Sequence, residues 1–343
     1  MAEAKRRVFL FFLFWVVFSW LGGQNYSLAD RLEELIYIMK NEEQKQEKQQ
    51  FPEEHQQFQQ ESSDQKPIDS QGDTLSVASQ QSYVDYEEIL RQQEFVPIRP
   101  LGRGAFGIVY EAYDQEYGIV AVKIIQKDKF DIRELEAAEI IHREAQDCPF
   151  FMDHFQQKPN KYYQILIEEY SNLNTLNLFA KQPQITLPRF EGMRILHKTG
   201  LIHRDIKCDN ILLHCPPGTR RVYAKISDFG FAKKEDSQHE QTYFAGTLPF
   251  MSPENFFQSA LISQKVDIYA LGITFYIIIV HKYPVNQPTF ELQQQKMTQI
   301  QSIERPQEIK DDILWDILSK MLEFDPIKRI SAQQALEHPY FTS

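Results

Sequence analysis

Three short motifs bring together residue types that suit the transfer of a phosphoryl group. Residues His203 to Leu212 read H-R-D-I-K-C-D-N-I-L, which places a carboxylate, an amine and an amide within six residues, between two apolar runs. Such a set could supply a base for a hydroxyl proton, a cation beside the transferred group and an oxygen ligand for Mg2+. Asp228-Phe229-Gly230 follows eighteen residues after Asn210, and a glycine-rich loop lies about a hundred residues before it. Three signals in this order are far more specific than any one of them.

The glycine-rich loop reads G-x-G-x-x-G from Gly102 to Gly107. This pattern alone is weak, because dinucleotide-binding folds share it, but in those folds the glycines open a helix. Here the loop is followed by Ile108-Val109-Tyr110 and then by Gly118 to Lys123, both apolar and rich in β-branched residues. The pattern predicts a strand, a glycine turn and further strands, so that backbone amides cover phosphates from above. Lys123 ends an Ala-Val-Lys run on the later strand.

Taken together, these motifs resemble those of the eukaryotic protein kinases, from about Phe95 to Phe341. The resemblance implies an α+β fold of two lobes: a small antiparallel β-sheet lobe with one helix, and a larger, mainly helical lobe. It implies ATP and Mg2+ as cofactors, bound between the lobes, and Ser/Thr hydroxyls of proteins as substrates. Lys207, two residues after Asp205, is the serine/threonine form of the motif.

The family's roles can be carried onto the matching positions of this chain. Asp205 is the expected catalytic base, with Lys207 beside it, and Lys123 is expected to pair with the α- and β-phosphates. Asn210 and Asp228 are the expected Mg2+ ligands. The residues expected to bind the nucleotide are Leu101, Gly102, Gly104, Gly107, Val109, Ala121, Lys123 and Glu169. His203 and Phe229 are expected to be packing residues rather than acid–base groups.

Lys123 also needs a glutamate from the helix that follows it. Residues 131–146 offer several, and Glu139 fits best, because it lies ten residues before Pro149 and is followed by two isoleucines. Four residues beyond Glu139, however, comes Arg143, where the family places an apolar residue. Glu136 would place Ile140 there instead, so we predict Glu139 as the partner and keep Glu136 as the alternative.

The strand before the expected hinge leaves its register open. If Glu169 and Tyr170 form the hinge, whose backbone reads the adenine edge, Glu168 falls at the position that guards the rear of the nucleotide pocket. A charge there is unusual in the family. A shift by one residue places Ile167 there instead.

The activation segment runs from Asp228 to Glu254 and ends in G-T-L-P-F-M-S-P-E, which resembles the family's G-T-x-x-Y-M-A-P-E. The resemblance implies that Thr247 contacts the catalytic loop and that Glu254 forms a buried ion pair with Arg329. Arg204 would read a phosphorylated residue in this segment, for which Thr242 is the first choice. Asp267 would anchor the catalytic-loop backbone, and the apolar run from Val266 to Val280 is expected to be a buried core helix.

One stretch departs from the family. Between Tyr170 and His203 the family has roughly ten more residues, which form a long core helix. Here Pro183, Pro188 and Gly192 interrupt that region, and its end alone is recognisable. We therefore weigh two hypotheses: an active serine/threonine protein kinase, and a kinase-like module that binds nucleotide or acts as a scaffold. Ser227 to Lys233 also faintly resembles autophagy-initiating and calcium-dependent kinases, although the chain has no calcium loop.

The first third of the chain has a different composition. Three basic residues precede an apolar run at 8–21, so residues 1–23 resemble a signal peptide or a short anchor and leave membrane association open. Leu28, Leu32 and Leu35 share one face of a predicted amphipathic helix within 24–40. Residues 41–82 are rich in Gln, Glu and Ser, and we assign 41–93 to a disordered linker before a kinase domain at 94–341.

Composition excludes some classes of function. The 343-residue chain carries a formal net charge of −11, which argues against nucleic acid as a partner. Its 42% hydrophobic content can supply a sizeable core. Its three cysteines make no disulfide framework and no zinc spacing, which favours a cytoplasmic protein with reduced thiols.

Overall fold

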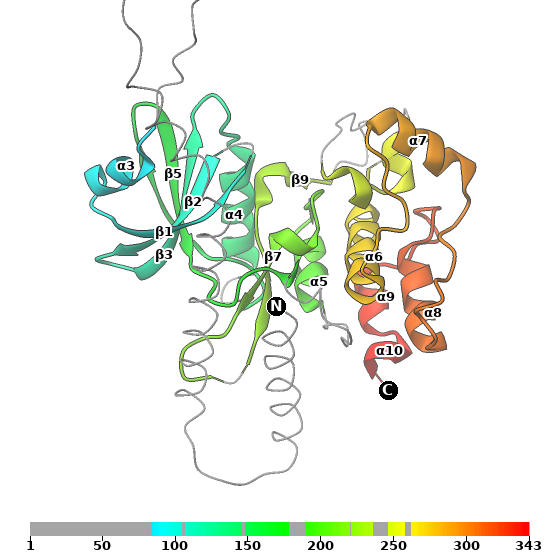
Figure 1. Cartoon of the computed structure of the whole chain (residues 1–343). Helices are drawn as coiled ribbons and strands as arrows, with labels where there is room; N and C mark the ends of the chain where they lie inside the picture. Colours follow the sequence, from blue (N-terminus) through cyan, green and yellow to red (C-terminus); the bar gives the residue numbers. More distant parts are fainter. Residues whose placement is uncertain are drawn as a thin grey trace, which may run out of the picture. The chain divides into compact units, whose positions relative to one another are not determined.

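The computed structural model describes residues 84–104, 107–145, 148–177, 190–219, 221–235, 246–257 and 262–342 (Figure 1). The predictions for the apolar segment 8–21, the amphipathic helix and the linker up to residue 83 lie outside these ranges. Thr242, Pro183 and Pro188 lie outside them as well. Within the described part of the chain, no helix is both long enough and apolar enough to cross a membrane.

One lobe is built on a five-stranded antiparallel sheet in the order β1-β2-β3-β5-β4. The strands are β1 (Val96–Arg103), β2 (Gly107–Asp114), β3 (Gly118–Gln126), β4 (His154–Pro159) and β5 (Tyr163–Glu169). β2 and β3 form the predicted hairpin, with Val109 opposite Lys123. The alternating side chains Ala112, Val120, Val122 and Ile167 are buried in one cluster on one face of the sheet. The opposite face carries Lys123.

A short helix, α3 (Tyr86–Gln92), precedes the sheet, so the folded domain starts before the predicted residue 94. Asp85 caps it by accepting a hydrogen bond from the Glu88 amide at 3.0 Å. Leu90 of this helix is fully buried and joins Phe95 in the cluster beneath β1 and β2. The linker prediction was therefore wrong for its last residues: the segment from Asp85 to Gln92 is ordered, because Leu90 completes the sheet's apolar layer.

Helix α4 (Arg133–Glu144) covers the face of the sheet that carries Lys123. Leu135 packs with Ile125 of β3 and Leu166 of β5 in a separate small cluster. Ala137 and Ile141 instead join the core of the helical lobe. The helix is thus packed against both lobes, which makes its first turn a natural place for a residue that links them.

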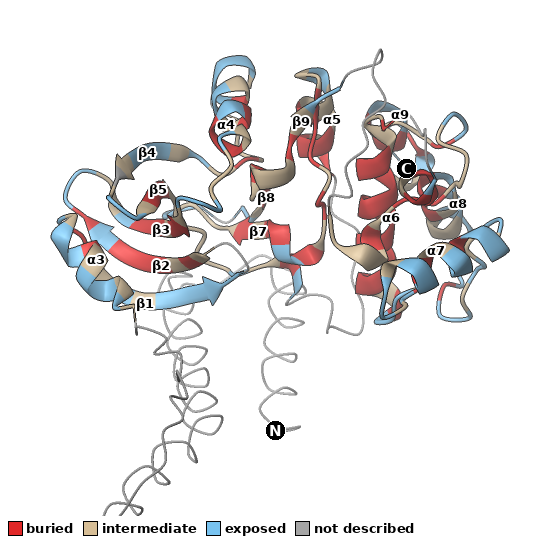
Figure 2. Cartoon of the chain, turned by 90° about the horizontal axis from the view of Figure 1, so that it is seen from above, coloured by how far each residue is buried: buried red, intermediate tan, exposed pale blue. Residues whose placement is uncertain are grey.

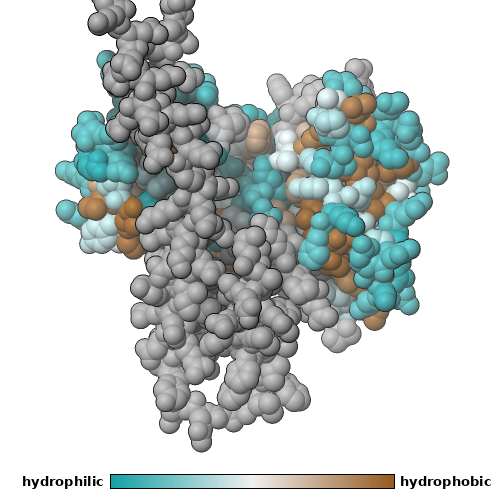
Figure 3. Space-filling view, in the orientation of Figure 1, coloured by the Kyte–Doolittle hydropathy of each residue, from teal (hydrophilic) through white to brown (hydrophobic). Residues whose placement is uncertain are grey.

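The second lobe is mainly helical. Its helices are α5 (Glu191–Lys198), α6 (Lys265–Val280), α7 (Phe290–Gln299), α8 (Asp312–Met321), α9 (Ala332–Leu336) and α10 (Pro339–Thr342). Two short antiparallel pairs hold the catalytic segments: β6 (Leu201–Ile202) with β9 (Lys233–Lys234), and β7 (Ile211–His214) with β8 (Tyr223–Ile226). α6 is buried along nearly its whole length (Figure 2), as predicted for the apolar run at 266–280. The described face of this lobe in Figure 3 is mostly hydrophilic, with apolar side chains in separate patches.

Helix α5 is only eight residues long, in line with the interrupted sequence before it. Gly192 does not break this helix, as the sequence suggested, but lies within it. A Cβ at Gly192 would stand 2.9 Å from the Phe150 Cβ and 3.3 Å from the Ile226 Cδ1. The glycine is needed because α5 approaches the segment before β4 too closely for any side chain.

The lobe is also held by a buried ion pair. The Arg329 guanidinium donates to both carboxylate oxygens of Glu254, at 2.6 and 2.8 Å, and this arginine is 1% exposed. It donates further to the carbonyls of Glu323 and Lys265 and lies over the Tyr269 ring. The predicted pairing of Glu254 with Arg329 is confirmed, and it ties the end of the activation segment to α6 and to the loop after α8.

Replacing Gly192 by alanine is expected to lower the free energy of unfolding by about 1–3 kcal/mol, although alanine is the better helix former. The clash with the Phe150 Cβ outweighs helix propensity. Urea denaturation should show this loss, while Lys198→Ala, at an exposed position of the same helix, should change stability by less than about 0.5 kcal/mol. An equal or more stable Gly192→Ala variant would contradict the close approach.

Glu254→Gln should cost about 3–5 kcal/mol, because it leaves the buried Arg329 charge without its counter-ion. The control is Glu304→Gln, which makes the same change at an exposed glutamate. Thermal unfolding of the two variants measures the difference. Equal melting temperatures would show that the carbonyl acceptors around Arg329 suffice without the carboxylate.

Candidate active site

The centre of the site is the ammonium of Lys123, held between carboxylates from two other elements. Lys123 Nζ lies 2.5 Å from Glu134 Oε1 of α4 and 3.1 Å from Asp228 Oδ1. β3, the sheet's main helix and the Asp-Phe-Gly motif therefore meet at one cation. The prediction of Glu139 as the partner of Lys123 was wrong, and so was the alternative Glu136, since both lie on the exposed side of α4.

The error has a physical cause. α4 begins at Arg133, so Glu134 lies in its first turn, where it is 7% exposed. Ala137 and Ile141, three and seven residues further on, share its buried face. A glutamate at the head of an apolar i, i+3, i+7 stripe was the signal in the sequence, whereas counting back from Pro149 selected the wrong turn of the helix.

The charges around Lys123 reinforce one another. Burial by itself would lower the pKa of Lys123, but the neighbouring carboxylates of Glu134, Asp228 and Glu168 outweigh it and leave the pKa raised. Burial would likewise raise the pKa of Asp228, and the Lys123 ammonium overcomes this, so that its pKa is lowered. At neutral pH the site thus holds a charged amine beside a charged carboxylate.

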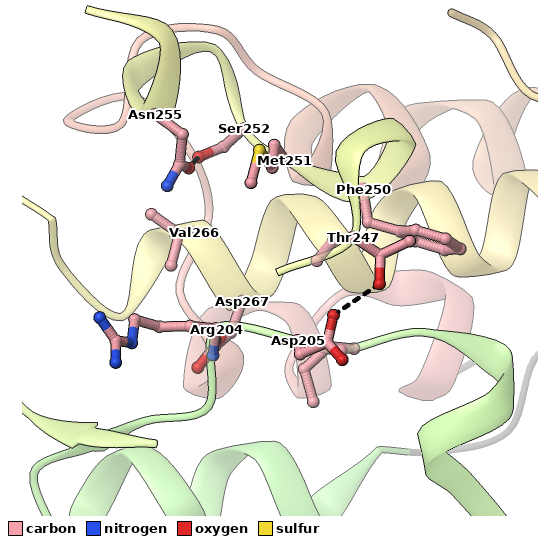
Figure 4. Close-up of a pocket in the computed structure, with 11 residues that line it drawn as sticks. Arg204, Asp205, Thr247, Phe250, Met251, Ser252, Asn255, Val266 and Asp267 are labelled. Carbon is pink, nitrogen blue, oxygen red and sulfur yellow. Dashed lines mark hydrogen bonds between the residues drawn. The ribbon is translucent and has the colours of Figure 1, made fainter. Parts of the chain in front are cut away.

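The catalytic loop brings a second set of polar groups together around Asp205. Thr247 Oγ1 donates to Asp205 Oδ1 at 2.8 Å (Figure 4). Lys207 Nζ lies 2.8 Å from Asp205 Oδ2 and 2.7 Å from Thr247 Oγ1. Asn210 Nδ2 donates to Asp205 Oδ2 and to the Asp205 carbonyl, both at 2.9 Å. The carboxylate is therefore held on both oxygens, and the predicted contact of Thr247 with the catalytic loop is confirmed.

Asp267, which is fully buried at the start of α6, holds the backbone of this loop. Its carboxylate accepts from the amides of His203 at 2.9 Å and Arg204 at 2.8 Å. Its Oδ2 atom also lies 3.0 Å from His197 Nε2 of α5. The backbone anchor was predicted, but the contribution of His197 was not, because nothing in the sequence joins that residue to α6.

The close approach of the activation segment to the catalytic loop depends on a glycine. Gly246 has a φ of +108°, and a Cβ there would stand 2.4 Å from the Arg204 carbonyl oxygen. Any other residue would push the segment away from the loop. Gly246 therefore allows Thr247, the next residue, to reach Asp205.

Aromatic packing connects the two motifs behind the polar groups. The His203 and Phe229 rings lie 5.0 Å apart, and the Phe229 and Phe151 rings 6.3 Å apart. His203 is fully buried, and its Nε2 lies 3.0 Å from the Ser227 carbonyl. Its contacts are those of a packing residue that positions the Asp-Phe-Gly segment, in agreement with the role expected for it.

Two of the predicted nucleotide-binding residues, Val109 and Ala121, lie on the face of the sheet that carries Lys123. Val109 lies opposite both Lys123 and Gly102 in the strand register, and Ala121 is two residues from Lys123 on the same face. A Cβ at Gly102 or Gly104 would meet nothing within 4 Å, which leaves the loop's backbone open to a ligand. Gly107 has another reason to be glycine, since a Cβ there would collide with the Ile124 carbonyl at 2.0 Å.

The register of β5 is settled by its pairing with β3. Ala121 lies opposite Glu168, so Glu168 shares the face of Lys123, while Ile167 is buried in the cluster on the other face. The side chain of Glu169 is engaged by Lys225 Nζ at 2.7 Å. The role of the Glu169 backbone toward adenine stays a prediction.

The oxygen atoms of Asn210 and Asp228 fit the ligand preference of Mg2+. The two hydrogen bonds from the Asn210 side chain to Asp205 both use the amide nitrogen, so the amide oxygen is left for a metal. Across the described ranges, no three acidic, histidine or cysteine side chains gather into a metal site. Two protein ligands together with phosphate oxygens are the usual way in which Mg2+ is held. The residues present therefore fit a magnesium–nucleotide complex.

Comparison with known proteins agrees with this geometry. The model of the protein kinase domain matches residues 95–341. The chain belongs to the protein kinase family, and several of its curated relatives are named as serine/threonine-protein kinases.

Aurora kinase C of Mus musculus is 30% identical over 256 residues, which cover 71% of this chain and 89% of the relative. The Aurora kinase of Schizosaccharomyces pombe is 28% identical, over 71% of this chain and 70% of its own length. Serine/threonine-protein kinase ULK3 of Xenopus laevis is 26% identical over 72% of this chain. The matched part spans 55% of the length of that ULK3 relative.

Glu134→Gln should lower kcat/KM for phosphate transfer by about tenfold or more, because it removes the carboxylate that holds Lys123 in place. Glu139→Gln is the matched control: the same substitution on the same helix, at an exposed position. Steady-state kinetics on both variants tests the pairing. A larger loss in Glu139→Gln than in Glu134→Gln would reverse the assignment.

Proposed function

We propose that this chain is an active serine/threonine protein kinase that uses MgATP to phosphorylate Ser and Thr hydroxyls of proteins. The observation that supports it most is the complete polar set on both sides of the site. Lys123 is paired with Glu134 and Asp228, and Asp205 is held by Lys207, Thr247 and Asn210. A chain retained only for binding would have no need to keep every one of these groups.

The residues divide the work between proton transfer and charge. Asp205, 4% exposed and held on both oxygens, is placed to accept the proton of a substrate hydroxyl. Lys207, at hydrogen-bond distance from Asp205 and Thr247, supplies a positive charge beside the reacting groups. Lys123 is the cation that orients phosphates, and Asn210 and Asp228 offer oxygens to Mg2+. MgATP, when bound, supplies the transferred phosphoryl group.

The proposed preference for Ser and Thr rests on Lys207, whose position two residues after Asp205 is the serine/threonine form of the catalytic-loop motif. Lys207 bridges Asp205 and Thr247, and this places the end of the activation segment against the base. Glu254, seven residues after Thr247, is locked to Arg329, so the floor on which a peptide would lie is rigid. This arrangement favours a peptide hydroxyl as the acceptor over a small metabolite.

The free thiols support the cytoplasm as the place of action. Cys148, Cys208 and Cys215 are unpaired. Burial raises the pKa of Cys208 to about 12, so this residue acts as a small packing group rather than a nucleophile. Three reduced thiols suit a reducing compartment.

The rival function is a kinase-like module that binds nucleotide without transfer. It is favoured by the eight-residue α5, which shortens a core helix of the family, and by the carboxylate of Glu168 beside Lys123. The two functions differ in a single respect: both bind MgATP, but only a kinase moves phosphate to a protein.

The test is transfer of labelled γ-phosphate from MgATP to a basic protein substrate by the full chain. Asp205→Asn should reduce transfer by about 10²–10⁴-fold, because the base is lost. Asp209→Asn, at an exposed aspartate in the same loop, should retain it within about twofold. Thermal stabilisation by MgATP without any transfer in the wild-type chain would establish the rival function instead.

A further inference from the structure

We infer that Glu168 selects the nucleotide base: its carboxylate accepts a hydrogen bond from the exocyclic amine of adenine, so that the site prefers ATP to GTP. The inference rests on the proposed function, because it requires a purine nucleotide in the site. It concerns a residue that neither phosphate handling nor proton transfer uses.

The strand register places Glu168 in a defined row across the sheet. His154, Glu168, Ala121, Glu111 and Arg99 are successive cross-strand partners, running from β4 through β5, β3 and β2 to β1. The next row on the same face holds Leu166, Lys123, Val109 and Gly102. Glu168 is thus diagonal to Lys123 and directly beside Ala121, on the face that looks toward the catalytic loop.

The same two rows locate the base. The phosphates belong with Lys123 and with the metal ligands Asn210 and Asp228, so the base must extend away from them along the sheet. Val109 and Ala121 offer an apolar surface there. A planar ring that lies on Ala121 has one edge next to Glu168.

Glu168 is the carboxylate in this row that is still able to accept a ligand's hydrogen bond. Glu111 is paired with Arg99 at 2.8 Å, and Glu169, the next residue in the chain, with Lys225 at 2.7 Å. Among the described residues, the ion-pair contact of Glu168 is with His154 Nδ1 at 3.9 Å, which is longer than a hydrogen bond. Its side chain is 24% exposed. A half-buried acceptor that lacks a donor gains when a bound ligand supplies one.

The chemistry of the two purines decides the preference. Adenine presents an amine donor at its 6-position, and guanine presents a carbonyl acceptor there. An ionised carboxylate is an acceptor only. It therefore attracts the adenine amine and repels the guanine carbonyl. A hydrogen bond to a charged group is strong enough to change affinity tenfold or more.

The experiment measures dissociation constants by calorimetry, with the full chain and the magnesium complexes of three triphosphates. These are ATP, GTP and purine riboside triphosphate, which lacks the 6-amine. Wild type should bind ATP at least tenfold more tightly than either of the others. Glu168→Met keeps the bulk but removes the carboxylate acceptor, and should reduce the preference for ATP over purine riboside triphosphate by at least about fivefold.

Glu168→Gln should give an intermediate preference, because its amide oxygen still accepts but its amide nitrogen can also donate to guanine. Glu116→Gln, at an exposed glutamate in the β2–β3 turn, is the control and should leave all three constants unchanged. Circular dichroism on each variant checks that it is folded. If Glu168→Met does not fold, Glu168→Gln still tests the inference.

Two results would overturn this inference and leave the proposed function intact. One is a wild type that binds the three nucleotides equally, and the other is a Glu168 variant that weakens all three by the same factor. The second would mean that Glu168 acts through Lys123 rather than on the base. If wild type binds no nucleotide at all, the proposed function fails first and the inference fails with it.

Discussion

The ammonium of Lys123 is the point at which the parts of this protein depend on one another. It is the shared partner of Glu134 on α4 and of Asp228 in the helical lobe, and it stands on the central strand of the sheet. Because a charge taken out of water is stabilised only where opposite charges are correctly placed, the position of α4 and that of the Asp-Phe-Gly segment are both constrained by this one group. A displacement of either element separates its carboxylate from the Lys123 ammonium.

The catalytic loop follows the same principle with backbone groups in place of a cation. One buried carboxylate, Asp267, holds two successive amides of the loop, and the adjacent Asp205 is then fixed by Asn210, Lys207 and Thr247. These contacts come from α6, from the loop itself and from the activation segment. The Asp205 carboxylate is thus oriented both by neighbours in its own loop and by Thr247, which is distant in sequence, so that the fold holds it in one geometry.

Close packing explains why three positions of the chain have no room for a side chain larger than that of glycine. Gly107, Gly192 and Gly246 each stand where a Cβ would meet backbone or a Cβ of another segment at less than 3 Å. The first joins β2 to β3, the second brings α5 to the segment before β4, and the third brings the activation segment to Arg204. The short α5 can serve as a core helix because Gly192 lets it sit deeper against its neighbours.

The sequence by itself determined the family and most of the polar residues that meet in the site. The residues with direct chemical roles lie in short motifs, and the alternation of apolar residues after the glycine loop predicted the β2–β3 hairpin. The ion pair of Glu254 with Arg329 also followed from the motifs. Local spacing suffices in these cases because each motif is built by a few neighbouring residues on one loop or strand.

The tertiary structure alone decided which glutamate meets Lys123, whether Ile167 or Glu168 of β5 shares the face of Lys123, and that His197 supports Asp267. These depend on where α4 begins, on the pairing of β5 with β3, and on the approach of α5 to α6. The tertiary structure also extended the folded domain back to Asp85. Leu90 is fully buried in the apolar cluster of the sheet, a contact that no local sequence pattern reveals. Such features arise from the packing of distant segments, where burial and register, rather than spacing along the chain, determine which groups meet.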